Sequence, residues 1–396
     1  MRIGSLFSGY GGLCELSVAP YLGGRVVWHS DIDPAASKVL AHHWPDTPNL
    51  GDVTQIDWGA VEPVDVLTGG FPCQDVSAAG RRAGLRPDTR SGLWSQFAYA
   101  ISELHPSLVV IENVRGLLSA EAYSDLEPCP LCLGDGSGGP VLRALGAVLG
   151  DLAGLGYDAF WCGVRAADVG APHNRFRVFI AAYPTLDGRP RSGSARAGRP
   201  GPSDDDRAIA DARRVLGAGR PAASEQTEGR RAFGHVAGRG DQSSSDASSD
   251  GRHEGRAKPT RNGRGPDAAV GGTSAHADSD RDGLEGVGRQ LAGARDADGC
   301  GGSHRAWGQY EPAIRRWERI LGRPAPAPTV AGRRGQPVLN PELGEWMMGL
   351  PAGHVTAVPG LTRNEKHRLV GNGVCPQQSD AALDFLIPMI REAVAA

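Results

Sequence analysis

The feature that most constrains the fold is the alternation of apolar runs with helical patterns over residues 1–183. Strands are predicted at Arg2–Phe7, Arg25–Ser30, Val64–Thr68, Leu108–Ile111, Asp158–Val164 and Phe176–Ala182, and helices at about Leu13–Leu22, Pro34–His43, Ser91–Leu104 and Val141–Leu155. This rhythm is typical of a doubly wound, mostly parallel α/β sheet. We therefore expect one Rossmann-like lobe over residues 1–183.

The next part of the chain has a different composition. Between Pro184 and Arg305 the only aromatic residue is Phe233, and Gly, Arg, Ser, Asp and Ala dominate. Such a segment buries too little apolar surface to offset its chain entropy, so we expect low complexity and disorder up to about residue 305. From residue 184 to 340 there are 26 Lys and Arg against 20 Asp and Glu, a charge of +6 that leaves −9 on the remainder.

Order is expected to return at Trp307–Leu321, where apolar residues fall at helical spacing. Further helices fit at Pro341–Met348 and Pro376–Ala393, with Gly371–Val374 starting the last one. Because the C-terminal part shows no strand pattern of its own, residues 338–396 are expected to pack back on the first lobe.

Cysteine usage and hydropathy indicate the cellular compartment of the protein. The seven cysteines are an odd, scattered set, which does not resemble a secreted disulfide framework. No charged-then-apolar leader precedes the first strand, and no apolar run approaches the length of a membrane span. We therefore expect a soluble, cytoplasmic protein without a membrane partner.

The stretch Gly69–Gln74 places one thiol on a tight loop. It follows an apolar strand, so Cys73 is expected at the carboxyl end of the sheet, where open α/β sheets bind ligands. Pro72 fixes its own φ and restricts Phe71, which aims the thiol. The alternative is that Cys73 is a small buried hydrophobe, as free cysteines usually are.

A glycine-rich turn and three carboxylates point to an adenosine-containing cofactor. The turn Gly9–Gly12 follows a strand and opens a helix, so backbone N–H groups can approach a ligand. Asp31 ends the second strand, where an acid can accept hydrogen bonds from ribose hydroxyls. Asp52, in Gly51–Val53, is a further carboxylate at a strand end. Tight turns needed by any doubly wound sheet, and helix capping by Asp31 and Asp33, are the alternatives.

Taken together, seven motifs make the chain resemble the DNA (cytosine-5) methyltransferase family. They are Leu6–Gly12, Asp31–Asp33, Gly51–Thr54, Gly70–Gln74, Glu112–Val114, Pro172–Arg177 and Gly371–Val374. They occur in the family's order and cover most of residues 1–183 and 338–390. The resemblance implies a class I methyltransferase fold divided into a catalytic lobe (1–183), a small, partly disordered target-recognition region (184–337) and C-terminal helices (338–396).

The resemblance also implies the ligands and their residues. S-adenosylmethionine would be the methyl donor, and a cytosine flipped out of double-stranded DNA the acceptor. Phe7 would stack on the adenine, Asp31 would hold the ribose and Asp52 would approach the adenine amino group. The rest of the cofactor site would comprise Gly9, Gly11, Gly12, Ile32, Pro72 and Asn372.

The chemistry explains the catalytic set that the resemblance implies. Position 5 of cytosine is a weak nucleophile, so a Cys73 thiolate must first add to position 6. Glu112 would protonate N3 if burial raises its pKa, Arg177 would fix the cytosine O2 and Arg175 would brace the site. No metal is required.

Two other segments are candidates for function. The segment Asp75–Asp88, with Gly80 and Gly84 as hinges and Arg81, Arg82 and Arg86 as phosphate partners, fits a loop that closes over DNA; a merely solvated basic loop is the alternative. Cys129 and Cys132 have metal-ligand spacing, but a zinc site would need Cys162, Cys300 or a histidine from elsewhere.

The sequence departs from the family pattern in two places. His173 stands where the family usually has glutamine, and Val338–Leu343 replaces the family's Arg-Leu-Thr-x-x-Glu stretch. The target sequence cannot be read from these residues. We expect a monomer, with a cognate restriction endonuclease as a possible partner or an orphan or phage methylase as the other context.

Three rival functions remain open at this stage. A tRNA cytosine-5 methyltransferase of the same family shares the Pro-Cys and Glu-Asn-Val motifs. A catalytically inactive DNA-binding relative is disfavoured by the intact Cys73, Glu112 and Arg177. A nicotinamide-dependent dehydrogenase is disfavoured because the turn lacks a full G-x-G-x-x-G pattern.

Overall fold

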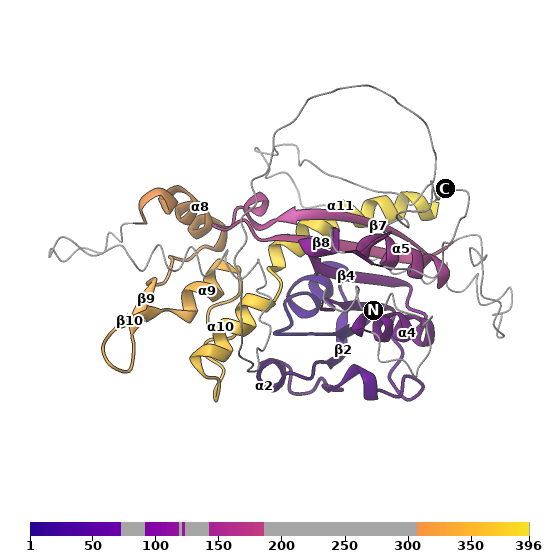
Figure 1. Ribbon diagram of the computed structural model, residues 1–396, viewed down its shortest axis with the longest axis horizontal. Coiled ribbons are helices and arrows are strands. Elements are labelled where there is room, and N and C mark those ends of the chain that lie inside the picture. The colour runs from indigo at the N-terminus through magenta and orange to yellow at the C-terminus, as the bar shows by residue number, and fades with distance from the viewer. Residues whose placement is uncertain (73–91, 119–120, 123–141, 186–306, 396) are drawn as a thin grey trace, which may run out of the picture.

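The computed structural model describes residues 1–72, 92–118, 121–122, 142–185 and 307–395. Its largest unit is a six-stranded sheet in the order β2-β1-β3-β4-β8-β7 (Figure 1). The strands are β1 (Arg2–Leu6), β2 (Arg25–Ser30), β3 (Val66–Gly69), β4 (Leu108–Val114), β7 (Tyr157–Arg165) and β8 (Phe176–Pro184). β2, β1, β3 and β4 run parallel, whereas β8 runs antiparallel to both β4 and β7. The prediction of a mostly parallel α/β sheet is confirmed.

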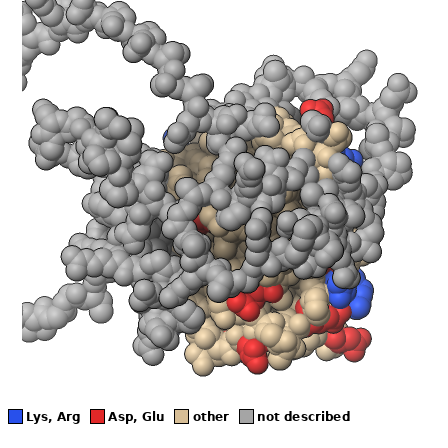
Figure 2. All heavy atoms as spheres, turned by 90° about the vertical axis from the view of Figure 1, so that its right-hand side faces the viewer, with Lys and Arg blue, Asp and Glu red and all other residues tan. Residues whose placement is uncertain are grey.

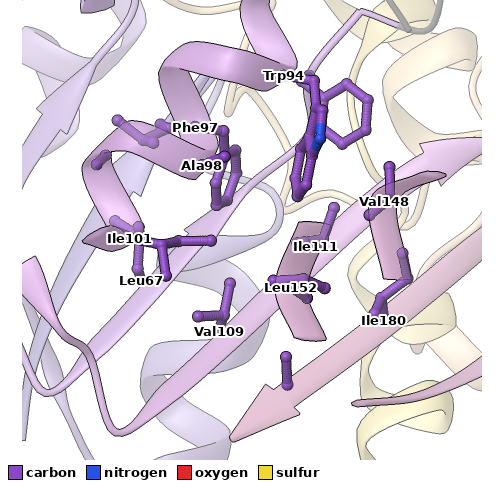
Figure 3. Packing of buried hydrophobic residues seen from close by; sticks show 14 of the residues in the cluster. Leu67, Trp94, Phe97, Ala98, Ile101, Val109, Ile111, Val148, Leu152 and Ile180 are labelled. Carbon is purple, nitrogen blue, oxygen red and sulfur yellow. The ribbon is translucent and has the colours of Figure 1, made fainter. Parts of the chain in front are cut away.

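Helices cover both faces of this sheet, because side chains alternate along each strand. Val109 and Ile111 pack under α4 and α5, and Figure 3 shows this layer with Phe97 and Leu152. Their neighbours on β4 point the other way and pack with η1, α1 and α11. The helices of this sheet lobe are η1 (a π-helix, Cys14–Val18), α1 (Ala19–Leu22), α2 (Pro34–His43), α4 (Leu93–Leu104), α5 (Ala144–Gly154) and α11 (Pro376–Ala395).

Short elements connect these larger ones. They are η2 (Val53–Gln55), η4 (Arg115–Leu118), β5 (Glu121–Ala122), β6 (Leu142–Arg143) and η5 (Ala166–Val169).

A second lobe, residues 307–372, lies beyond the carboxyl ends of the parallel strands (Figure 1). It comprises η6 (Gly308–Tyr310), α8 (Glu311–Leu321), β9 (Thr329–Ala331), β10 (Pro337–Leu339), α9 (Pro341–Met347) and α10 (Arg363–Asn372). Trp317 and Trp346 are fully buried in its small core, which also takes in Ala166 and Ala171 of the sheet lobe. A further cluster joins Tyr10 and α2 to the loop before α10. The two lobes therefore share packed interfaces.

Several elements match their predicted bounds, and β2 and α2 match them residue for residue. The start of α2 has a clear cause: Asp33 Oδ1 accepts the Ala35 N–H at 2.8 Å, and Pro34 occupies the first helical position. The helix expected over Leu13–Leu22 is instead a π-helix followed by one α-helical turn. Pro20 has no N–H to donate, so a regular α-helix cannot run through this position.

The C-terminal predictions need more correction. α8 begins at Glu311 rather than Trp307, because Pro312 fits only the first turn of a helix. The expectation of no strands there was wrong, since β9 and β10 form an antiparallel hairpin. Gly371–Val374 does not start the last helix; α10 ends at Asn372 and α11 begins at Pro376. The predicted disorder of residues 186–305 falls outside the described residues.

Within the described ranges, no helix is both long enough and apolar enough to cross a membrane.

Candidate active site

A cavity of about 1400 Å³ opens at the carboxyl ends of β1, β2, β3 and β4. Residues from both lobes line it, so it lies where the sequence places a ligand site. Most of the predicted site residues meet on its wall: Phe7, Gly9, Gly12, Asp31, Ile32, Asp52, Pro72, Glu112, Arg175, Arg177 and Asn372. Gly11 does not line it.

The turn after β1 is held in a conformation that exposes its backbone. Phe7 has φ of +52°, which is uncommon for a residue with a side chain, and its ring stacks on Phe97 at 6.4 Å between centroids. Gly9 has φ of +56°, and a Cβ there would meet nothing within 4 Å. A Cβ at Gly12 would lie 2.7 Å from the Val374 carbonyl oxygen. Gly9 therefore leaves open space for a ligand, whereas Gly12 allows close packing against the C-terminal segment.

Asp31 is fixed by backbone hydrogen bonds on both of its carboxylate oxygens. Oδ2 accepts the Gly9 N–H at 2.7 Å, and Oδ1 accepts the Asp33 N–H at 2.8 Å. Burial raises the pKa of Asp31, against the lowering effect of these two N–H groups. Each oxygen keeps a lone pair that can accept a ligand hydroxyl. Ile32, next in the chain, is 71% exposed and offers an apolar surface to the cavity.

Asp52 has a local structural role as well as a place on the cavity wall. Its Oδ1 accepts the Thr54 N–H at 2.9 Å and the Thr54 hydroxyl at 2.8 Å, which caps η2. The second oxygen, Oδ2, remains on the same carboxylate for a ligand donor.

Glu112 and Arg177 form a buried ion pair across β4 and β8. Arg177 Nε lies 2.7 Å from Glu112 Oε1, and both side chains are at most 10% exposed. A Cβ at Gly70 would lie 2.8 Å from Glu112 Oε2, so a larger residue in the loop after β3 would displace this carboxylate. Asn113 holds the same loop by donating its Nδ2 to the Phe71 carbonyl at 3.0 Å. The pair offers an acid and a guanidinium to one planar polar ligand.

Arg175 joins the two lobes at the other end of the cavity. Its Nη1 donates to the Gly371 carbonyl at 2.8 Å and its Nη2 to the Gly373 carbonyl at 2.6 Å. These carbonyls flank Asn372, which lines the cavity at the end of α10. Arg175 lies one residue before β8, and it braces the end of α10.

His173 makes a second link between the lobes. It is buried, and its Nε2 lies 3.0 Å from the Met347 carbonyl oxygen at the end of α9. Burial lowers the pKa of His173 to about 4, and the nearby Arg175 and Arg177 act in the same direction. The ring is therefore neutral at pH 7 and donates its proton to that carbonyl.

Several predictions fall outside the described residues. Cys73 is among them, although Pro72 immediately before it lines the cavity. The segment Asp75–Asp88 and the pair Cys129 and Cys132 are likewise outside. Among the residues that the structure does describe, no three metal-ligating side chains gather into a metal site.

Three supporting residues were not found from the sequence. Tyr10 donates its hydroxyl to the Val374 carbonyl at 2.7 Å, Glu345 holds a loop of the second lobe, and Arg368 binds Asp33 of the sheet lobe. The Thr-x-x-Glu pattern of Thr362 and Glu365 is a capping box that would have revealed the start of α10. The partners of Tyr10 and Arg368 lie more than 300 residues away in the chain, where no local pattern points to them.

Comparisons with known proteins match this chain to a family model and to curated methyltransferases. Residues 1–187 match the family model described as C-5 cytosine-specific DNA methylase. The chain is 34% identical over 156 residues to the Type II methyltransferase M.NlaIV of Neisseria lactamica, covering 39% of this chain and 34% of that protein. It is 42% identical over 125 residues to M.Eco47II of Escherichia coli, covering 31% and 29%.

The matched region spans about a third of the curated relatives' own length. Among solved structures, DNMT2 of Spodoptera frugiperda aligns over 97% of this chain and 98% of its own, with 14% identity and a TM-score of 0.46.

Proposed function

Residues 1–187 of this chain belong to the C-5 cytosine-specific DNA methylase family, and from that premise we propose that the protein is a DNA (cytosine-5) methyltransferase. It would move a methyl group from S-adenosylmethionine to C5 of a cytosine flipped out of double-stranded DNA. The observation that carries the proposal is the buried Glu112–Arg177 pair, which shares one cavity with Phe7 and Asp31.

The part of the cavity lined by Phe7, Asp31 and Asp52 fits S-adenosylmethionine through its apolar surface and its hydrogen-bond acceptors. Phe7 and the exposed Ile32 offer apolar surface to an adenine ring. Asp31 keeps acceptor capacity for ribose hydroxyls, and Asp52 for an amino group. Asn372 would face the methionine end. When bound, the cofactor supplies an electrophilic methyl group.

The other half fits the Watson–Crick edge of cytosine. Arg177 would donate to the cytosine O2, and a protonated Glu112 would donate to N3. The Arg177 guanidinium holds the Glu112 carboxyl group in position across the two strands. A hydrogen bond or proton from Glu112 at N3 would offset the negative charge that the ring gains when the Cys73 thiolate adds to C6.

Cys73 would carry the covalent step. Its thiolate would form a bond to C6, and the C5–C6 π electrons would move to C5. C5 would then take the methyl group as the S–CH3 bond of the donor breaks, which leaves S-adenosylhomocysteine. A base removes the C5 proton, the electron pair reforms the double bond, and the sulfur leaves as thiolate. Pro72 and Gly70 would fix the loop that presents Cys73.

Transfer of radiolabelled methyl groups to DNA tests the proposal. Wild-type protein is expected to label duplex DNA of diverse sequence and to leave tRNA unlabelled. Cys73→Ser should abolish labelling, and Glu112→Gln should lower it by roughly 10²-fold or more, because a positioned acid contributes on this scale. Label found only on tRNA would show that tRNA, not DNA, is the substrate. Label that persists in the Cys73→Ser variant would exclude the covalent route.

The biological context is a separate proposal. The curated relatives carry "Type II methyltransferase" in their names, which supports placing this chain beside a restriction endonuclease. Sequencing the methylated sites would define the target, and DNA methylated by this protein should then resist an endonuclease that cuts there. An orphan methylase would give the same methylation pattern without such an endonuclease in the host.

A further inference from the structure

An ion pair joins α10 to the loop that follows β2. Arg368 binds the Asp33 carboxylate through both terminal nitrogens, Nη1 to Oδ2 and Nη2 to Oδ1, the latter at 3.0 Å. The two residues are 335 positions apart in the chain, so the contact exists only in the folded two-lobe protein. Both residues also line the cavity.

Asp33 connects this pair directly to Asp31. The Asp33 backbone N–H donates to Asp31 Oδ1 at 2.8 Å, while Asp31 Oδ2 accepts from Gly9 at 2.7 Å. The same Asp33 carboxylate caps α2 through the Ala35 N–H. A guanidinium on α10 therefore fixes the residue that orients one oxygen of Asp31, and Gly9 orients the other.

The electrostatics show that this pair is charged at neutral pH. The hydrogen bond from Arg368 lowers the pKa of Asp33, and the hydrogen bond to Asp33 raises the pKa of Arg368. The side chains are 40% and 21% exposed for Arg368 and Asp33, so solvent screens the attraction and the effect is modest. Two-point contact nevertheless restricts rotation of the carboxylate more than a single hydrogen bond would.

We propose that Arg368 is a positioning residue for S-adenosylmethionine, acting through Asp33 on the carboxylate of Asp31. This inference rests on the proposed function, because it assigns Asp31 to the cofactor. Without Arg368, the turn 31–33 keeps its helix cap but loses its tie to the second lobe. Asp31 is then held less firmly, and cofactor affinity falls.

A second contact between the lobes offers a control for effects that come only from weaker association of the two lobes. Lys38, also on α2, donates its Nζ to the Gly360 carbonyl at 2.9 Å, close before α10. This contact joins α2 to the loop before α10, and thus the same two lobes, without touching Asp33 or Asp31. If Arg368 acted only as an inter-lobe tie, Lys38→Ala would have the same consequence as loss of Arg368.

The experiment measures binding of S-adenosylmethionine to the full chain by calorimetry, in the absence of DNA. Arg368→Gln is expected to raise Kd by roughly 3- to 5-fold, the upper range for a partly exposed ion pair. Arg368→Lys should recover part of the loss, and Lys38→Ala should change Kd by less than about 2-fold. In steady-state methylation, KM for the cofactor should rise while kcat at saturation stays near the wild-type value.

A double-mutant cycle separates the pair from other effects. Asp33→Asn keeps a good helix cap but removes the charge, so it should raise Kd about as much as Arg368→Gln. Combining both substitutions should add little further. Equal Kd values for wild type and Arg368→Gln, additive effects in the cycle, or an equal rise with Lys38→Ala would each overturn the proposal. A wild-type chain that binds no S-adenosylmethionine would instead overturn the proposed function.

Discussion

Glu345 shows how one buried charge can organise a loop. It is 1% exposed, and its two carboxylate oxygens accept the N–H groups of Gly353, Val355 and Thr356 at 2.6 to 2.7 Å. These bonds satisfy backbone donors that have no helical partner in the turn after α9. This loop also positions His354, whose Nε2 lies 2.8 Å from the Tyr10 carbonyl oxygen in the sheet lobe.

Replacing Glu345 by glutamine is expected to destabilise the protein by about 2–3 kcal/mol, because an amide NH₂ would face a backbone donor and the charge-assisted bonds would be lost. Chemical denaturation would measure the change. Glu342→Gln on the exposed face of the same helix is the control and should cost less than about 0.5 kcal/mol. Equal losses for the two variants would contradict this role for Glu345.

His173 makes the stability of the protein depend on pH. Burial lowers the pKa of His173 to about 4 from an ordinary 6.5, so the unfolded chain binds the proton more tightly than the folded one. Stability is therefore complete above pH 6.5 and falls as the pH drops towards 4. Each such proton contributes up to about 1.4 kcal/mol per pH unit.

Urea denaturation between pH 4 and 7 would test this dependence. His173→Gln should flatten the slope by up to one proton, and the remaining slope should include His354, whose pKa burial also lowers to about 4. His105→Gln, at an exposed histidine, should leave the slope as in wild type. An unchanged slope in His173→Gln would show that its proton is not linked to folding.

At the scale of elements, the β9–β10 hairpin stands out because it projects from the second lobe (Figure 1). Its turn carries Arg333 and Arg334, both exposed, and Val330 on β9 is 40% exposed. The other end of the hairpin reaches the cavity, since Leu339 lines it. A two-stranded ribbon has the dimensions of a DNA major groove, so under the proposed function this hairpin meets the duplex.

The double variant Arg333→Ala/Arg334→Ala is expected to weaken DNA binding and to reduce the slope of log K against log salt by up to about 2, because each phosphate contact contributes about 0.9. Binding of S-adenosylmethionine should not change. Arg25→Ala/Arg391→Ala removes two exposed arginines of the sheet lobe, on β2 and α11, and should preserve the slope. A slope that both double variants share with wild type would exclude the hairpin from the DNA interface.

The elements also show what a sequence can and cannot predict. β2 and α2 were predicted with their observed bounds because apolar runs and the Asp33-Pro34 start signal are local. β9 and β10, at three residues each, are too short for a periodic pattern to stand out. α10 is rich in charged residues, so its start was visible only in its capping box.

At the scale of the whole molecule, charge is divided between the two lobes. Residues 307–372 carry 9 Lys and Arg against 5 Asp and Glu, whereas the described part of residues 1–185 carries 8 against 14. Figure 2 shows acidic side chains on the face turned away from the β9–β10 hairpin. This division favours approach of a polyanion from the side of the second lobe.

The candidate site was largely predictable because its residues belong to short motifs at strand ends. Asp31 and Glu112 meet in one cavity because parallel strands bring their carboxyl ends to one edge, and Arg177 joins them from the amino end of the antiparallel β8. The ties between lobes were not predictable, since Arg368 with Asp33 and Arg175 with Gly371 are contacts between distant parts of the chain. Only the folded topology brings these partners together.

The placement of α11 has a consequence for how the chain is made on the ribosome. This helix covers one face of the sheet with Leu383, Leu386, Ile387 and Ile390, all of them buried. It is synthesised roughly 190 residues after β8, which takes about 10–40 s at ~5–20 residues per second. Throughout that interval the nascent sheet exposes the apolar surface that α11 later covers, so its resistance to aggregation depends on what shields that surface during translation.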